Sequence, residues 1–132
     1  MTYLLDTHIL IWAFFETDKL SGRIKKILSD GNNTIFVSAV SFWEISIKTG
    51  TGKISLGDIT PDLLPDICRQ QGFELAGVTV EEAGSFYKLS NDYHKDPFDR
   101  MLVWQAITNK YILISDDPRI REYAAEGLQI LW

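Results

Sequence analysis

The chain has 132 residues, of which 45% are hydrophobic and 23% are charged, and its net charge is −5. This length predicts a single domain over residues 1–132 with a substantial buried core. The acidic balance argues against a surface that attracts nucleic acid through overall positive charge, although a local basic rim around a site is compatible with it. The single cysteine, Cys68, excludes an internal disulfide and favours a reducing, cytoplasmic location.

The N-terminal residues 1–16 are apolar but do not have the pattern of a signal peptide. They begin without basic residues, and Asp6 and His8 interrupt the apolar stretch. The longest uninterrupted apolar run, residues 9–15, is too short to span a bilayer. We therefore expect no membrane association.

The first half of the chain alternates short strands with helices. Residues 3–5 predict a strand that leads into a helix over residues 7–15, and Ser21 is a predicted N-cap for a helix that ends near residue 29. The β-branched and aromatic run 34–37 predicts a second strand. A helix over residues 39–49 follows, which the glycines at 50 and 52 terminate.

The second half continues the alternation. Its predicted helices cover residues 60–71, 79–89, 97–109 and 118–125, and the second of these begins with a capping box formed by Thr79 and Glu82. The predicted strands lie within residues 73–78, 111–115 and 129–131. The order of elements predicts an α/β fold, a three-layer sandwich in which helices flank a mostly parallel central sheet.

Acidic residues come directly after two predicted strands. Asp6 follows the first strand, and Asp116 and Asp117 follow the buried strand 111–115. Ligands of open α/β sheets bind beyond the carboxyl ends of the strands, so we expect these acids to share one site. Asp99 lies in the first turn of the helix 97–109.

A further acid, Glu44, lies inside the apolar run VSFWEISI at residues 40–47. An unpaired carboxylate in such a setting carries a large desolvation cost. On a helix, Glu44 shares a face with Val40, Ile47 and Lys48, and that face is expected to turn mostly inward. Something must therefore compensate its charge.

Each acid also has a purely structural explanation. Asp6 and one of the two adjacent aspartates after residue 115 could cap helices, and Asp99 could complement the dipole of its helix. Glu44 could pair with Lys48 four residues later. These explanations and a shared functional site stay open together.

Several carboxylates in one pocket repel one another, and a hard divalent cation relieves that repulsion. Mg²⁺ and Mn²⁺ prefer oxygen ligands of this kind. The histidines His8 and His94 are isolated and do not have zinc-ligand spacing. We interpret His8 as a helix residue near the mouth of the site and His94 as a loop residue. An all-carboxylate site indicates hydrolysis of phosphate esters by a metal-activated water.

Four stretches in a fixed order carry a family resemblance: LLDTHILIW, VSAVSFWEISIKTGTGKI, DPFDRMLVWQAI and ILISDDPRI. Over essentially its whole length the chain resembles PIN-domain ribonucleases, and more narrowly VapC-type toxins of type II toxin–antitoxin systems. The resemblance implies a PIN-like fold and a Mg²⁺- or Mn²⁺-dependent endoribonuclease acting on RNA. It also implies a homodimer and a cognate antitoxin that inhibits the toxin through a side chain such as arginine.

The resemblance also assigns the catalytic and metal-binding residues, which are Asp6, Glu44, Asp99 and Asp117. The fourth acid lies in the sequence Ser115-Asp116-Asp117-Pro118, where the family usually has Thr-x-Asp. Ser115 therefore stands in place of the threonine, and Asp116 is the alternative to Asp117.

Basic and aromatic residues near these acids allow further hypotheses. One hypothesis is that some of four basic side chains contact substrate phosphates. The alternative is that they are ordinary solvated charges. The four are Lys48, Lys53, Arg100 and Arg119. Six aromatic residues are interpreted mainly as core and dimer-interface residues and not as base-stacking platforms: Trp12, Phe14, Phe42, Trp43, Phe98 and Trp104.

Two alternative functions remain. One is a housekeeping RNA-processing nuclease without an antitoxin, which the absence of a neighbouring antitoxin gene would favour. The other is a non-catalytic interaction scaffold on the same fold, which predicts no response to metal. A haloacid-dehalogenase phosphatase is a poor fit, because it needs an aspartate two residues after Asp6, where His8 stands.

Overall fold

The computed structural model describes all 132 residues. Its strands are β1 (Thr2–Leu5), β2 (Thr34–Ser38), β3 (Glu74–Ala76), β4 (Ile112–Ile114) and β5 (Gln129–Leu131). Its α-helices are α1 (Thr7–Phe15), α2 (Gly22–Ser29), α3 (Ala39–Gly50), α4 (Leu64–Gln70), α5 (Val80–Ser85), α6 (Pro97–Asn109) and α7 (Pro118–Arg121). Short 3-10 turns lie at Thr17–Lys19, Pro61–Leu63, Phe86–Lys88 and Glu122–Glu126.

The five strands form one sheet in the order β3-β2-β1-β4-β5, and every neighbouring pair is parallel. The predicted mostly parallel sheet is thus confirmed and is parallel throughout. From β1 the chain first builds outward through β2 and β3, and later returns to add β4 and β5 on the other side. The carboxyl ends of β1 and β4 therefore flank the switch point, where α/β sheets place their ligand sites.

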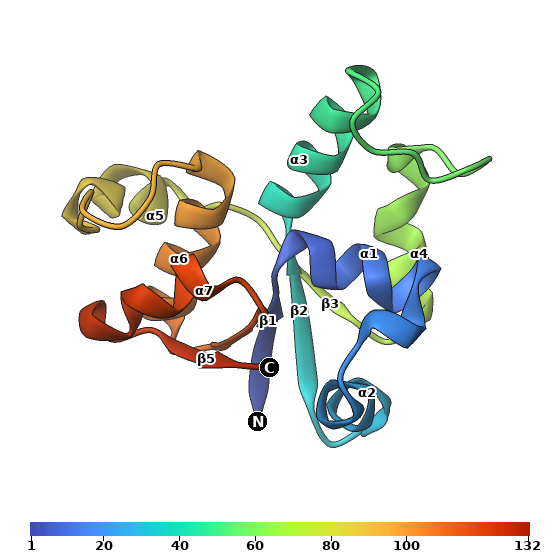
Figure 1. Cartoon of the computed structure of the whole chain (residues 1–132), viewed down its shortest axis with the longest axis horizontal. Coiled ribbons are helices and arrows are strands. Elements are labelled where there is room, and N and C mark those ends of the chain that lie inside the picture. Colours follow the sequence, from blue (N-terminus) through green and yellow to red (C-terminus); the bar gives the residue numbers. More distant parts are fainter.

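Helices cover both faces of the sheet, which confirms the three-layer sandwich. Tyr3 and Leu5 point into a core shared with α1, α2 and α4, whereas Leu4 between them points into a core shared with α6. This alternation is the two-residue period of a strand. Figure 1 shows α1, α2 and α4 on one side of the strands and α5, α6 and α7 on the other.

Two of the predicted helix starts are confirmed by their caps, whereas Thr60, also a predicted N-cap, makes no capping hydrogen bond through its side chain. Ser21 accepts a hydrogen bond from the backbone N–H of Ile24, and Thr79 and Glu82 form both hydrogen bonds of the capping box. The predicted helix 60–71 differs, because its first turn is the 3-10 turn before α4. Pro65 cannot donate the backbone hydrogen bond that would continue an α-helix through this point.

Two other predicted helices are also divided. The region 79–89 is α5 followed by a 3-10 turn, and the region 118–125 is α7 followed by a 3-10 turn. No helix in the molecule is both long enough and apolar enough to cross a membrane.

Candidate active site

Asp6 is the first acid of the site and is fixed by the fold on three sides. It leaves β1 with its side chain only 1% exposed, and its Oδ1 accepts a hydrogen bond of 2.7 Å from the backbone N–H of Thr7, which caps α1. Its Oδ2 accepts a hydrogen bond from Ser115 and lies 3.2 Å from Nδ1 of His8. Burial raises the pKa of Asp6, although these partners oppose the shift.

Glu44 projects from α3, a helix that Ser38 caps at the end of β2. Its side chain is 7% exposed, and its Oε2 forms an ion pair with Lys48, as expected for the structural explanation. Its Oε1 is buried and has no hydrogen-bond partner. Buried carboxylate oxygens are rarely left without a partner. Lys48 therefore pairs with one oxygen of this carboxylate and leaves the other oxygen without a partner.

Asp99 lies in the first turn of α6, where Asp96 caps the helix by accepting from the backbone N–H of Asp99 at 3.1 Å. Oδ2 of Asp99 is 3.5 Å from Nε2 of His94. Burial raises the pKa of Asp99 to about 8, and further increases come from four surrounding carboxylates, Asp6, Asp96, Glu44 and Asp117. The acids are thus close enough to interact electrostatically.

The two adjacent aspartates after β4 have different positions. Asp117 caps α7 and binds the guanidinium of Arg119 through Oδ2 at 3.0 Å. Burial alone would raise the pKa of Asp117, but its hydrogen bonds with Arg119 hold that pKa below the usual value. Asp116 instead contacts Nε2 of His8. Asp117 lines a pocket together with Asp6, Glu44 and Asp99, whereas Asp116 does not line it.

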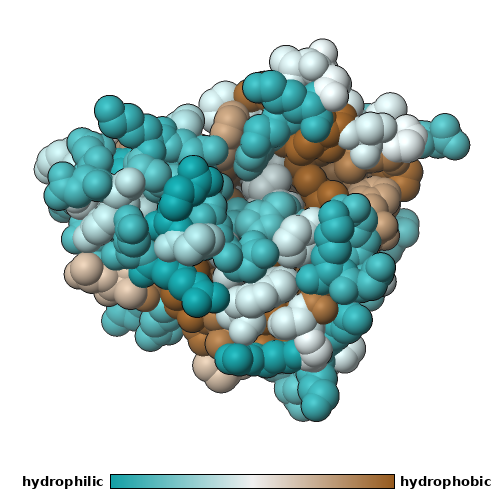
Figure 2. Space-filling view, in the orientation of Figure 1, coloured by the Kyte–Doolittle hydropathy of each residue, from teal (hydrophilic) through white to brown (hydrophobic).

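All four acids named from the sequence line one pocket of about 220 Å³. The whole lining, called the acidic pocket below, is Asp6, Thr7, His8, Ile11, Glu44, Lys48, Ile54, Asp96, Asp99, Asp117 and Arg119. Figure 2 shows hydrophilic side chains over the centre of this face, between the two groups of helices. Residues far apart in the sequence thus converge at the switch point of the sheet.

The donor set of the acidic pocket fits a hard divalent cation. Its oxygens come from carboxylates, and the unpartnered Oε1 of Glu44 is a free donor atom. In the geometry of this structure, no group of three or more His, Cys, Asp or Glu side chains would hold a metal ion. Two of the four acids are instead ion-paired, Glu44 with Lys48 and Asp117 with Arg119.

Some lining residues have a weaker signal in the sequence. His8 does lie at the site, between Asp6 and Asp116. His94 is on a loop, as expected, but its ring is buried against Asp99 and Tyr123. Asp96 is not among the acids predicted to line the site, and its position before Pro97 signals only a helix cap.

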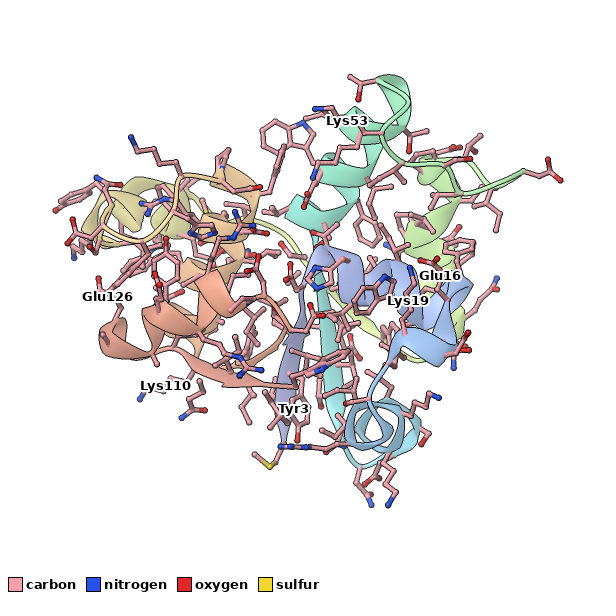
Figure 3. The ribbon with its side chains drawn as sticks, in the orientation of Figure 1. Tyr3, Glu16, Lys19, Lys53, Lys110 and Glu126 are labelled. Carbon is pink, nitrogen blue, oxygen red and sulfur yellow. The ribbon has the colours of Figure 1, made fainter.

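The phosphate-contact hypothesis is wrong for Arg100. This side chain is 5% exposed, and its guanidinium donates to the carbonyl of Ser90 at 2.7 Å and to Oδ1 of Asn91 at 2.8 Å. Lys53 is exposed and lies near the outer end of α3, away from the strands (Figure 3). Lys48 and Arg119 are the two basic side chains of the four that line the acidic pocket.

The interpretation of the aromatic residues as core is confirmed for five of the six. Five of these residues are partly buried and pack against the two core clusters: Trp12, Phe14, Phe42, Phe98 and Trp104. Trp43 differs, because it is 63% exposed and contacts Phe98 edge to face at 5.2 Å between ring centroids. Its helix position faces outward next to Glu44.

The chain is similar to known proteins over nearly its whole length. The chain is 25% identical to Ribonuclease VapC22 of Mycobacterium tuberculosis over 131 residues, which cover 99% of this chain and 98% of that protein. Its fold is similar to that of VapBC2 of Rickettsia felis, which was crystallised with a promoter DNA fragment. The TM-score is 0.72 at 18% identity, and the match covers 99% of this chain and 98% of that chain. DNA-bound VapBC of Salmonella typhimurium is also similar in fold, with a TM-score of 0.69 at 14% identity. This match covers 99% of this chain and 97% of that chain.

The family assignment rests on the match over most of the chain. Residues 3–126 match the PIN domain, a span that starts in β1 and extends beyond α7. It therefore contains every acid of the acidic pocket. The expected PIN-like fold is thus confirmed, and the chain belongs to the PIN domain family.

Proposed function

We propose that this protein is a divalent-metal-dependent endoribonuclease and the toxin of a toxin–antitoxin pair, acting in the cytoplasm as one unit over residues 1–132. The observation that carries the proposal is the convergence of Asp6, Glu44, Asp99 and Asp117 on one pocket, with Oε1 of Glu44 buried and unpartnered. The similarity to Ribonuclease VapC22 supports RNA as the substrate.

The four acids are the proposed ligands of Mg²⁺ or Mn²⁺. The bound cation would supply Lewis-acid polarisation of the scissile phosphate and a lowered pKa for the attacking water. Thr7, Ser115 and His8 orient the Asp6 carboxylate, so its oxygens need little rearrangement to act as ligands. In the metal-free protein at neutral pH, Asp99 keeps a proton, which reduces repulsion among the acids.

Lys48 and Arg119 have a second proposed role at the pocket. Each is paired with one of the ligand acids in this structure. With those acids engaged as ligands, Lys48 and Arg119 would be free to contact substrate phosphates beside the scissile bond. Such contacts position the RNA without reading its sequence.

The proposed protein partner is a cognate antitoxin, because the similar structures include VapBC complexes. The acidic pocket would accept an arginine from that partner, since a guanidinium binds a carboxylate through two hydrogen bonds. If a bound antitoxin abolished cleavage while leaving the pocket open, this mode of inhibition would be wrong.

The proposed homodimer would use the apolar groove beside the acidic pocket. This groove has a volume of about 480 Å³ and is lined by Ala39, Val40, Trp43, Val78, Phe86, Pro97, Phe98 and Met101. Exposed apolar surfaces of this kind commonly mark protein interfaces. A second copy of the chain should bury Trp43, and sedimentation should therefore show a dimer that the Trp43→Lys variant cannot form.

The test of the proposed function is cleavage of total RNA by purified, antitoxin-free protein in Mg²⁺, Mn²⁺ or EDTA. Discrete fragments that need metal and are absent with the Asp6→Asn variant would support a nuclease. A nuclease whose gene has no adjacent antitoxin gene would favour the housekeeping alternative. A folded protein that neither cleaves RNA nor responds to Mn²⁺ would favour the scaffold.

A further inference from the structure

The carboxyl edge of the sheet carries a second surface next to the acidic pocket. β5 is the edge strand beside β4, and Ile114 is in register with Leu131. The backbone N–H of Ser115 donates to the carbonyl of Leu131 at 3.1 Å. Trp132 therefore leaves the sheet beside Ser115, whose hydroxyl binds Asp6.

A row of aromatic rings joins the acidic pocket to this surface. The ring of His8, which lines the pocket, contacts Trp12 edge to face at 4.9 Å between centroids. Trp12 in turn contacts Trp132 edge to face at 5.9 Å. Lys19 lies over the ring of Trp12 at 5.7 Å and pairs with Glu16, its neighbour in Figure 3. Trp12 is thus the middle ring of the row, and Trp132 is the end ring that lies farthest from the acidic pocket.

Beyond the row, Trp132 lines a cavity of about 350 Å³, called the arginine cavity here. Its lining is Arg23, Arg121, Ala124, Ile130, Leu131 and Trp132. Arg121 ends α7, the short helix that Asp117 caps from within the acidic pocket. Two sites that differ in charge therefore include residues from the two ends of one short helix.

The two arginines of this cavity differ from the other arginines of the chain. Arg69 and Arg119 are ion-paired, and Arg100 is buried. Arg23 and Arg121 are exposed and pair with no carboxylate. In a chain of net charge −5, two unpaired guanidinium groups in one cavity form a local positive site.

We infer that the arginine cavity binds the single-stranded part of the substrate RNA next to the scissile bond, with Arg23 and Arg121 on phosphates and Trp132 stacked on a base. Single-stranded nucleic acids are held in this way, by positive side chains along the backbone and aromatic faces under the bases. The inference rests on the RNA substrate proposed above. Trp12 is then a positioning residue, because it supports Trp132.

The experiment uses the full chain with the Asp6→Asn change, which keeps RNA intact during binding measurements. The ligand is a fluorescein-labelled fragment of an RNA that the wild-type protein cleaves, and its affinity is measured by anisotropy over a range of salt concentrations. Arg23→Gln/Arg121→Gln is compared with Lys25→Gln/Lys26→Gln, which removes the same charge from exposed positions on α2.

The arginine variant is expected to lower the magnitude of the slope of log K against log salt by about 1.4, or about 0.7 for each phosphate that an arginine no longer neutralises. The lysine variant should leave the slope near that of the parent. Trp132→Ala should weaken binding by roughly tenfold, and Trp132→Phe should restore most of the affinity, because a phenyl ring still stacks. In the cleaving protein, these variants should raise KM with little change in kcat.

The outcomes separate this inference from the proposed function. If the wild-type protein cleaves RNA and the arginine and lysine variants behave alike, the inference is wrong while the nuclease stands. If the arginine variant loses binding of a co-purified protein but keeps its RNA slope, the cavity is a protein surface and the inference is also wrong. A wild-type protein that does not cleave RNA at all contradicts the proposed function itself.

Discussion

The hydroxyl of Ser115 donates a hydrogen bond of 2.7 Å to Oδ2 of Asp6, which joins the residue after β4 to the residue after β1. Both side chains are buried at the switch point of the sheet. Ser115 also accepts from the backbone N–H of Asp117 at 3.2 Å. One hydroxyl therefore sets the relative positions of two proposed metal ligands.

Ser115→Ala should weaken Mn²⁺ binding by about 10- to 100-fold, the usual effect of removing a hydrogen bond that orients a metal ligand. Ser115→Thr keeps the hydroxyl and should bind nearly as well as the wild type. Calorimetric titration of Mn²⁺ into the three proteins measures the difference. Equal affinity for the alanine and wild-type proteins would show that this hydrogen bond does not orient the site.

Glu44→Gln should keep the fold but reduce metal-dependent RNA cleavage by about 100-fold or more, because an amide is a poor ligand for a hard cation. Lys48→Met removes the ion-pair partner of Glu44 and one proposed phosphate contact but no proposed metal ligand, and it should reduce kcat far less. Single-turnover cleavage, with circular dichroism as a check on folding, distinguishes the two. If Glu44→Gln cleaves like the wild type, Glu44 has only the structural ion-pair role with Lys48.

Asp99 should make the stability of the metal-free protein depend on pH. Its pKa is raised to about 8, so the folded protein keeps a proton that the unfolded chain loses above about pH 4. The folded state binds more protons in this window, and its stability therefore falls as pH rises from about 4 to about 8. Asp99→Asn removes this effect and should be the more stable protein at pH 8, by at least about 1.4 kcal/mol.

Urea unfolding in EDTA at pH 5 and pH 8 checks this expectation, with the smaller difference between the two proteins at pH 5. Added Mn²⁺ should stabilise the wild type more than the variant, since the wild type gains about 2.7 kcal/mol at a hundredfold excess over Kd and the variant gains much less. A wild type whose metal-free stability does not decrease over this pH range would refute the role assigned to Asp99.

Arg100→Gln should destabilise the fold by about 2–4 kcal/mol, because it leaves the buried hydroxyl of Tyr123 and the partly buried carbonyl of Ser90 without their donor. It should not change the salt dependence of RNA binding. Lys48→Gln removes the same charge from the acidic pocket and should reduce that slope by about 0.7. A flattened slope for Arg100→Gln at unchanged stability would return Arg100 to the set of phosphate contacts.

Much of the fold followed from local signals in the sequence. Ser21, Thr79 and Asp96 begin helices because a side-chain oxygen before a helix accepts a hydrogen bond from its free N–H groups. The positions of Asp6 and Asp117 directly after apolar strands predicted a shared site, because parallel strands end at one edge of a sheet. The structure places both in the acidic pocket.

Tertiary packing decided what local signals could not. Arg100 and Arg121 have the same side chain, but α6 packs Arg100 against Ser90 and Asn91 while Arg121 stays exposed beside Trp132. Trp43 is aromatic like its neighbour Phe42, yet it faces outward. Sequence spacing determines which residues share a helix face. Whether that face packs against the core or faces solvent depends on the arrangement of all the elements.

The sequence by itself therefore predicted the order of the elements and most of their caps, because these depend on neighbouring residues, and its resemblance to PIN-domain ribonucleases predicted the four acids. Only the tertiary structure decided that Lys48 satisfies one oxygen of Glu44 and leaves the other free, and that Arg23 and Arg121 meet in one cavity. Such contacts join residues from separate elements or depend on local burial, so they exist only once the sheet and its helices have packed.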